Sequence, residues 1–186
     1  MKRLFDILLS TTLLVILLIP MIFIAFAVKI SSRGGIIYWS DRIGKNNAMF
    51  KMPKFRTMMI GTPSVATHLL QNPKSNLTPI GNFLRKYSLD EFPQLMTILI
   101  GDMSFVGPRP ALYNQEDLIK LRISKGVDQL IPGLTGWAQI NGRDELPILQ
   151  KVKMDEEYLL RQSLIFDLRI LWLTLYRVLK KDGVSH

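Results

Sequence analysis

The sequence predicts an α+β protein that is mainly helical, with an N-terminal re-entrant membrane helix, a small β-hairpin and amphipathic interfacial helices. Three observations indicate this class. A long uncharged apolar run follows the first few residues, two short β-favouring runs surround a turn-forming stretch, and most of the remaining chain has apolar residues at helical spacing. At 186 residues the chain is long enough for one compact domain and an accessory segment. We expect the accessory segment at 1–32 and the domain at 33–186.

Composition limits the chemistry. The formal net charge of +9 calls for an anionic partner, such as nucleic acid, an acidic membrane surface or phosphorylated small molecules. The chain has no cysteine, which excludes disulfides and thiol chemistry, and its two histidines leave no cluster for zinc and little prospect of a Ser-His-Asp relay. Any catalysis must therefore rest on carboxylates, cations and the backbone.

The apolar run from Ile7 to Val28 lies between the charges of Asp6 and Lys29. It is long enough to span a bilayer core of ~30 Å. A cleaved signal peptide is one alternative, since basic residues precede the run and Ala25 to Ala27 matches an A-x-A exit. The run is longer than a typical signal core, so the sequence favours a retained membrane anchor.

Pro20 lies inside this run, where it removes a helix hydrogen bond and kinks the axis. The two arms, Ile7 to Ile19 and Met21 to Val28, are each shorter than the ~20 residues of a spanning helix. Basic residues flank both sides, so the positive-inside rule gives no asymmetry. They are Lys2 and Arg3 before the run, and Lys29, Arg33, Arg42 and Lys45 after it. This pattern predicts a re-entrant helix with Pro20 as its break and both ends in the cytoplasm; a kinked spanning helix is the alternative.

A β-hairpin is expected next, with strands at Ile36 to Ser40 and Met49 to Phe55 around a Gly-Lys-Asn-Asn turn. The stretch from Gly61 to Gly81 is rich in Pro, Ser, Thr and Asn, which predicts a mobile loop.

Helical patterns follow the loop. They cover Pro79 to Leu99 with an interruption near Pro93, Leu112 to Lys125, Leu146 to Gln162, and Ser163 to Lys181. On the last helix the apolar side chains share one face, with charged residues around the rest. This face comprises Leu164, Leu168, Leu171, Trp172, Leu175 and Leu179. Such a basic amphipathic helix suits a membrane interface, and an ordinary core-facing helix is the alternative.

Two adjacent carboxylates, Asp90 and Glu91, stand in the stretch "RKYSLDEFPQL". On its own this stretch fits an ordinary helix start, with Ser88 as the capping residue and Glu91 as its capping-box partner.

Four phrases of the sequence point to a specific alternative. They are "KFRTM" (54–58), "SLDEFPQL" (88–95), "GDMSFVGPRP" (101–110) and "PGLTGWAQINGR" (132–143), in that order after the N-terminal apolar helix. With Asp155, Tyr158 and Asp167 beyond them, the chain closely resembles the bacterial sugar transferase family, the monotopic phosphoglycosyl transferases. The resemblance covers nearly the whole chain.

The resemblance implies transfer of a sugar 1-phosphate from a UDP-sugar to polyprenol phosphate with release of UMP, the first membrane step of glycoconjugate assembly. It implies an aspartyl-phosphosugar intermediate on Asp90, with Glu91 supporting Mg²⁺ and Asp90 beside the same ion. It also makes 33–186 a cytoplasmic catalytic domain on the bacterial inner membrane, in contact with membrane lipids.

Residue chemistry agrees with these roles. A carboxylate that approaches a diphosphate is repelled by its charge, so a hard divalent cation and nearby guanidinium groups are needed. Arg85, Arg109 and Arg143 lie in or beside the motifs, and Lys54 and Arg56 share one face of the predicted strand. Three glycines of the last motif suit either a close approach to a ligand or simple turns. They are Gly133, Gly136 and Gly142.

The family usually has Ser before the membrane-helix proline and Arg before the Pro-Gly of the last motif, where this chain has Ile19 and Ile131.

Two other classes of function are alternatives to the enzyme. A nucleic-acid-binding module would explain the positive charge, but the sequence has no zinc-finger spacing, RNP-like motif or long basic helix, so we expect no nucleic-acid partner. A membrane scaffold would tolerate loss of both Asp90 and Glu91.

Overall fold

The computed structural model describes residues 1–63, 73–142 and 146–180. The helices are α1 (Lys2–Ser31), α2 (Gly81–Lys86), α3 (Gln94–Ile100), α4 (Glu116–Ser124), α5 (Trp137–Ile140), α6 (Ile148–Arg161) and α7 (Leu164–Lys180). The strands are β1 (Ile37–Ile43), β2 (Met49–Phe55), β3 (Ser104–Val106), β4 (Ala111–Leu112) and β5 (Gly133–Thr135). The α+β, mainly helical class is confirmed.

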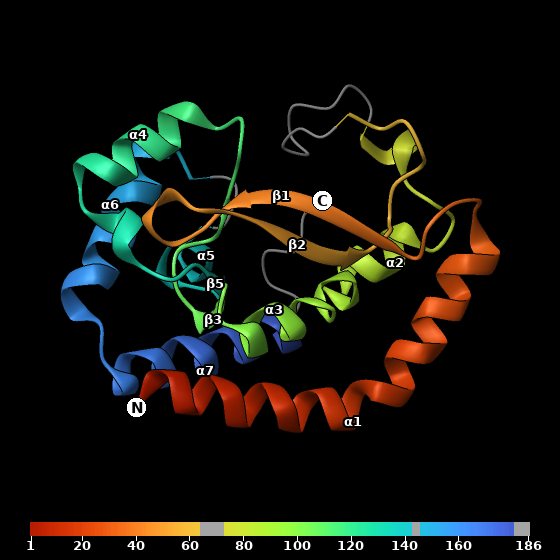
Figure 1. Ribbon diagram of the computed structural model, residues 1–186, viewed down its shortest axis with the longest axis horizontal. Helices are drawn as coiled ribbons and strands as arrows, with labels where there is room; N and C mark the ends of the chain where they lie inside the picture. Colours follow the sequence, from red (N-terminus) through yellow and green to blue (C-terminus); the bar gives the residue numbers. More distant parts are fainter. Residues whose placement is uncertain (64–72, 143–145, 181–186) are drawn as a thin grey trace.

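The hairpin forms the centre of the molecule (Figure 1). β1 and β2 pair antiparallel from Ile37 opposite Phe55 to Ile43 opposite Met49, and β4 joins the other edge of β1. The second strand begins and ends as expected, whereas the first continues to Ile43. In the turn, Asn46 and Asn47 adopt φ of 53° and 60°, a left-handed conformation that Asn tolerates better than most residues. Asn47 in the turn donates to Asp128 Oδ2 at 3.4 Å, just after α4, and Phe55 at the open end of the hairpin shares a core cluster with Leu84 of α2.

A second, parallel sheet of β3 and β5 was not predicted. It depends on glycines that allow two backbones to touch. A Cβ atom on Gly133 would lie 2.1 Å from the nitrogen of Gly107, and one on Gly136 would lie 2.1 Å from the Gly107 carbonyl oxygen. In this structure Gly133 and Gly136 therefore serve backbone-to-backbone packing between the "GPRP" and "PGLTG" motifs.

The helix predicted from Pro79 to Leu99 is divided more than expected. It forms α2, a short 3₁₀ turn at Leu89–Glu91, and α3. Ser88 stands before the turn with φ of 53°, and Pro93 stands before α3. α4 starts later than predicted because Ala111–Leu112 pairs with β1 as β4. Part of the predicted mobile loop, 64–72, lies outside the described residues.

Helix α1 is continuous from Lys2 to Ser31 and contains Pro20. It bends instead of ending there, and Figure 1 shows its second half turning up along the side of the domain. This differs from the expected break because proline removes one hydrogen bond while the neighbouring turns keep theirs. Among the described residues, α1 is the one helix long and apolar enough to cross a membrane, judged by length and composition.

Both halves of α1 pack on the same domain. The first half contributes Leu9, Leu13, Leu14 and Leu17 to the main core, and the second contributes Met21, Ile24, Ala25 and Val28 to a smaller core around Phe55 and Leu84. Its outer face is apolar and exposed. The exposed side chains are Leu4, Leu8, Val15, Ile16, Leu18, Ile19, Ile22, Phe23, Phe26 and Ile30.

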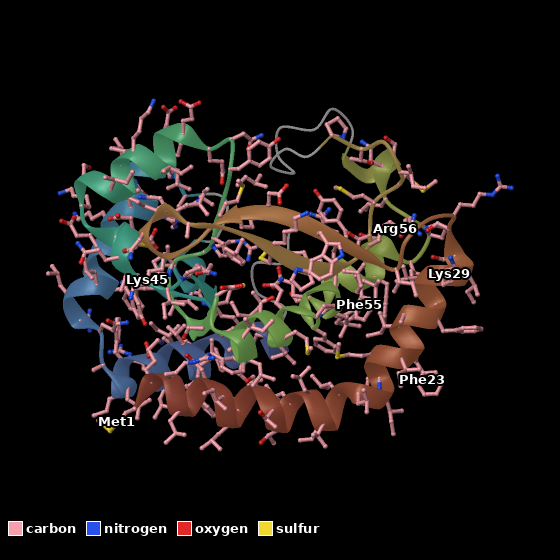
Figure 2. The ribbon with its side chains drawn as sticks, viewed as in Figure 1. Met1, Phe23, Lys29, Lys45, Phe55 and Arg56 are labelled. Atoms are coloured by element: carbon pink, nitrogen blue, oxygen red, sulfur yellow. The ribbon has the colours of Figure 1, made fainter. Side chains whose placement is uncertain are left out.

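Polar contacts fix the two ends of α1. At the start, Lys2 Nζ lies 2.6 Å from Asp167 Oδ2, and Arg3 donates to the carbonyls of Ile98 and Leu99 at 2.6 and 2.7 Å. At the other end the guanidinium of Arg56 donates to the carbonyls of Ser32, Arg33 and Gly35. Figure 2 shows Arg56 near the end of the helix that carries Lys29, far from Met1. The rest of the chain therefore holds both ends of α1.

In helix α7 the structure shows which side chains meet the core. Phe166 and Ile170 are buried, whereas Leu168, Trp172 and Leu175 on the predicted apolar face are exposed. Leu171 of the same face packs against the main core. The stripe is therefore divided: Leu171 meets the core, and the exposed members point outward as they would on an interfacial helix.

Candidate active site

Asp90 and Glu91 occupy the 3₁₀ turn between α2 and α3. The left-handed Ser88 makes no side-chain capping hydrogen bond, so the alternative of a capped helix start is not what this stretch forms. The side chains of the two acids are instead turned toward cations from other parts of the chain.

Glu91 is the anionic member of the pair. Its Oε1 atom accepts a hydrogen bond from Lys54 Nζ at 2.7 Å and another from Arg109 Nη2 at 3.3 Å. Burial opposes ionisation of Glu91, but the charges and hydrogen bonds of Lys54 and Arg109 outweigh it and hold the pKa of the carboxyl well below its usual range. Glu91 is therefore a carboxylate at any physiological pH.

The pKa of the adjacent Asp90 is shifted in the opposite direction. Its side chain is buried, and burial raises its pKa to about 6. The charge of Glu91 adds to this rise, whereas Lys54, Arg85 and Arg109 oppose it. A pair of acids with such divided pKa values is typical of a catalytic site in which one group reacts and the other stays charged.

The structure brings together most of the residues predicted for the site. Lys54 reaches Glu91 from the end of β2, Arg109 reaches it from the loop after β3, and the charge of Arg85 acts on Asp90 from the last turn of α2. Arg143 lies outside the described residues. Arg56, which was expected to share a strand face with Lys54, follows the last residue of β2. Its guanidinium binds the chain after α1, so Arg56 does not belong to the site.

Two further arginines hold the loop that carries Arg109, and the sequence interpretation gave neither a role there. Arg42 Nη1 donates to the carbonyl of Pro110 at 3.1 Å, and Arg122 Nη1 donates to the carbonyl of Arg109 at 2.8 Å. The signal for Arg122 was present: it lies four residues after the buried Leu118, on the inward face of α4, where a charge needs a partner.

The donor set bears on Mg²⁺. Among the described residues no group of three or more Asp, Glu, His or Cys side chains could hold a metal. Mg²⁺ commonly binds through one or two carboxylates and completes its shell with substrate phosphates and water. The adjacent Asp90 and Glu91 could supply such carboxylates, and the hydrogen bonds that Glu91 accepts from Lys54 and Arg109 both end at Oε1.

Comparison with known proteins gives the same result as the motifs. The family model described as "Bacterial sugar transferase" matches residues 1–181. The chain belongs to the bacterial sugar transferase family.

Several relatives within this family align with almost the whole chain. The UDP-glucose:undecaprenyl-phosphate glucose-1-phosphate transferase of Escherichia coli is 40% identical over 185 residues, which is 95% of this chain and 40% of the relative. The undecaprenyl-phosphate galactose phosphotransferase of Salmonella typhimurium is 35% identical over 202 residues, or 98% of this chain and 41% of the relative. The uncharacterized sugar transferase EpsL of Bacillus subtilis is 35% identical over 100% of this chain and 90% of the relative. The chain thus spans about two fifths of the first two relatives.

In this bacterial sugar transferase the four motifs meet around one centre. The first supplies Lys54, the second the Asp90–Glu91 pair and the third Arg109. The described part of the fourth supplies β5, which pairs with β3 and supports the Arg109 loop.

Proposed function

We propose that this chain transfers a sugar 1-phosphate from a UDP-sugar to polyprenol phosphate, with release of UMP, through an aspartyl-phosphosugar intermediate on Asp90. The names of the Escherichia coli and Salmonella relatives give undecaprenyl phosphate as a reactant, and the first also gives a UDP-sugar. The observation that carries the proposal for this chain is the contact of Glu91 with Lys54 and Arg109 beside the buried Asp90.

In the first step the ionised carboxylate of Asp90 attacks the phosphorus that bears the sugar. A bond forms between that phosphorus and a carboxylate oxygen, the phosphoanhydride bond breaks, and UMP leaves with the bonding electron pair. Lys54 and Arg109 place positive charge beside both acids, and Arg85 places it beside Asp90. This charge lessens the repulsion between Asp90 and the diphosphate.

In the second step a phosphate oxygen of the lipid attacks the same phosphorus. The acyl phosphate bond to Asp90 breaks, the polyprenol diphosphate sugar forms, and the carboxylate is regenerated. An acyl phosphate retains a good leaving group, so this step needs little further activation. The two displacements require only one nucleophilic side chain and no cysteine or histidine.

We further propose that Asp90 and Glu91 hold Mg²⁺ together with the donor diphosphate. The bound ion would neutralise negative charge on the phosphate oxygens. Glu91 suits this role because it stays ionised, and Lys54 and Arg109 orient it from one side.

The proposed membrane arrangement is supported by the exposed apolar residues of α1 and α7. The exposed apolar faces of both helices would lie in one leaflet of the bacterial inner membrane, against its lipids, and the active site would face the cytoplasm. Both ends of α1 would then lie on the cytoplasmic side, since one domain holds them. The lipid phosphate and the UDP-sugar could reach Asp90 from that same side.

The test is a UMP-release assay on the detergent-solubilised full chain with undecaprenyl phosphate and a panel of UDP-sugars. We expect UMP release with at least one donor and formation of a lipid-linked sugar diphosphate. Release of UDP, or product formation that is equal with and without the lipid phosphate, would contradict the proposal. The control is Lys120→Met on the exposed side of α4, which should leave turnover unchanged.

A further inference from the structure

The carbonyl of Arg109 is bound by a buried guanidinium group. Arg122 Nη1 donates to this carbonyl at 2.8 Å, while its Nε and Nη2 atoms donate to Asp155 Oδ2 at 3.1 and 2.7 Å. Arg122 is 8% exposed and Asp155 is 1% exposed. One side chain of α4 therefore connects α6 with the backbone of the loop that supplies a cation to the active site.

Stability alone does not account for this arrangement. Removing an arginine and a carboxylate from water is costly, and an apolar pair of similar volume often gives equal or greater stability. What an arginine offers instead is a planar, rigid fork of donors that fixes the relative positions of two acceptors. Here the two acceptors are a carboxylate on α6 and the Arg109 carbonyl.

Hydrogen bonds hold the backbone of the loop on both sides of Arg109. The orientation of the Arg109 side chain therefore depends on how the Arg109 carbonyl is held. Gly107 N donates to the Thr135 carbonyl at 2.9 Å, and Gly133 N donates to the Pro108 carbonyl at 2.9 Å. Arg42 holds the carbonyl of Pro110. Prolines on both sides restrict the backbone further. A hydrogen bond to the Arg109 carbonyl then fixes its ψ angle and the direction in which the side chain leaves the loop.

We propose that Arg122 is a positioning residue for the transfer reaction: through the Arg109 carbonyl it holds the Arg109 side chain toward Glu91 and the donor diphosphate. This inference rests on the proposed function. Within the described part of the chain, Arg122 hydrogen-bonds to Asp155 and to the Arg109 carbonyl, and not to Asp90 or Glu91. Its effect on activity must therefore pass through Arg109.

The first variant is Arg122→Lys, which keeps the charge but has one ammonium group in place of the fork and cannot hold both acceptors in the same geometry. We expect kcat/KM for UMP release to fall about tenfold or more, as small misplacements of a catalytic group do. Lys125→Met is the matched control. It removes one positive charge at the end of the same helix and an exposed ion pair with Glu156 on α6, and it should retain wild-type kcat/KM.

The deciding readout is a double-mutant cycle with Arg109→Ala. If Arg122 acts through Arg109, adding Arg122→Lys to Arg109→Ala should change kcat/KM by less than about twofold, because the group that it positions is already gone. A merely structural role would lower activity by the same factor in both backgrounds.

A second variant separates loss of the Arg122 hydrogen bond from loss of folding. Arg122→Met with Asp155→Leu removes both buried charges, so no unpaired carboxylate remains, and it should keep the thermal unfolding midpoint close to that of wild type while kcat/KM falls as in Arg122→Lys. Wild-type kcat/KM in this folded double variant, or losses that multiply in the cycle, would overturn the role of Arg122. A wild-type chain that releases no UMP with any donor would instead overturn the proposed function.

Discussion

The ammonium group of Lys2 lies 2.6 Å from Oδ2 of Asp167, a buried carboxylate near the start of α7. Tyr158 donates to the other carboxylate oxygen at 2.7 Å, and Lys2 also donates to the Val106 carbonyl at 2.9 Å. The first turn of α1 is thereby joined to α6, α7 and β3. This contact keeps the start of the apolar helix against the domain that carries Asp90.

Replacement of Lys2 by Met should lower the free energy of unfolding by about 1–3 kcal/mol, because Asp167 stays buried and loses one charged partner while keeping Tyr158. Thermal unfolding in detergent measures the effect. Lys29→Met, an exposed lysine at the other end of α1, is the control and should change the midpoint little. Equal midpoints for the two variants would show that the Lys2 contact does not stabilise the domain.

Asp90→Asn should abolish turnover without unfolding the protein, because a carboxamide of nearly the same shape cannot act as the nucleophile. Glu91→Gln should be severely impaired, since Lys54 and Arg109 would lose their anionic partner. The direct measurement is trapping of a radiolabelled phosphosugar on the wild-type protein and its absence on Asp90→Asn. Undiminished UMP release by Asp90→Asn would remove Asp90 from the nucleophile's role.

The Asp90→Asn substitution should also stabilise the metal-free protein at neutral pH. The pKa of Asp90 rises from 3.8 to about 6 in the folded state, so ionising Asp90 above that range weakens folding by up to about 3 kcal/mol. Asn carries no such charge. In EDTA, Asp90→Asn should therefore unfold at a higher temperature than wild type above pH 6, and the advantage should disappear below about pH 4.

Glu91→Gln should change stability in the opposite direction in the same pH experiment. The pKa of Glu91 is lowered by folding, so its carboxylate contributes stability above its usual value of 4.5 that is lost as the pH falls toward the lowered value. Glu91→Gln should accordingly be less stable than wild type at pH 7, with the difference shrinking in acid. Parallel pH profiles for the two variants would contradict the divided pKa values.

A further prediction concerns the metal. The carboxylates of Asp90 and Glu91 offer hard oxygen atoms, and the chain has no cysteine. If they hold Mg²⁺ as proposed, excess EDTA should remove UMP release and Mg²⁺ should restore it, with thiophilic metals as poor substitutes. The measurement is UMP release against free Mg²⁺ concentration, with a calcium-saturated chelator as the control for chelator effects. Full activity in excess EDTA would exclude the proposed role of Mg²⁺.

The sequence predicted the elements whose signal is local. The hairpin was found because Met49 to Phe55 is β-favouring and follows two asparagines that suit a tight turn, and α6 and α7 were found from apolar spacing. The parallel pairing of β3 with β5 was not found, because each strand has only three residues and the pairing depends on contact between Gly107 and Gly133. Distant contacts of that kind leave no periodic pattern.

In the candidate site, too, residues with a local sequence signal were predicted and those defined by distant contacts were not. The motifs located Asp90, Glu91, Lys54 and Arg109, since these residues stand inside recognisable phrases. The residues that hold them were harder to assign. Arg56 was expected on the same strand face as Lys54, yet only the fold shows that Arg56 reaches the end of α1 and Lys54 reaches Glu91. Arg122 carries no motif, and its role depends on where the Arg109 carbonyl lies.

The last prediction concerns Pro20 and the path of α1. A straight helix of 30 residues would be about 45 Å long. In the structure α1 bends instead, and its two ends are held by Asp167, which binds Lys2, and by Arg56, which binds the chain after Ser31 (Figure 1). Pro20 lies inside α1, and proline is the residue that most favours such a bend. Pro20→Leu should favour a straight apolar helix that crosses the bilayer, and should move the N-terminus outward or impair transfer to the lipid phosphate.

Because the chain has no cysteine, single cysteines report the topology directly. One can be added ahead of Met1, which leaves the Lys2 contact intact, and the other introduced as Arg33→Cys, whose side chain is exposed. An impermeant thiol reagent applied to intact cells should label neither site in the Pro20 protein and should label the N-terminal site in Pro20→Leu if that helix now spans. Both sites should react after the cells are opened. Labelling of the N-terminal site from outside in the Pro20 protein would establish a spanning helix and overturn the re-entrant arrangement, while the assignment of Asp90 would stand, since it depends on contacts within the domain.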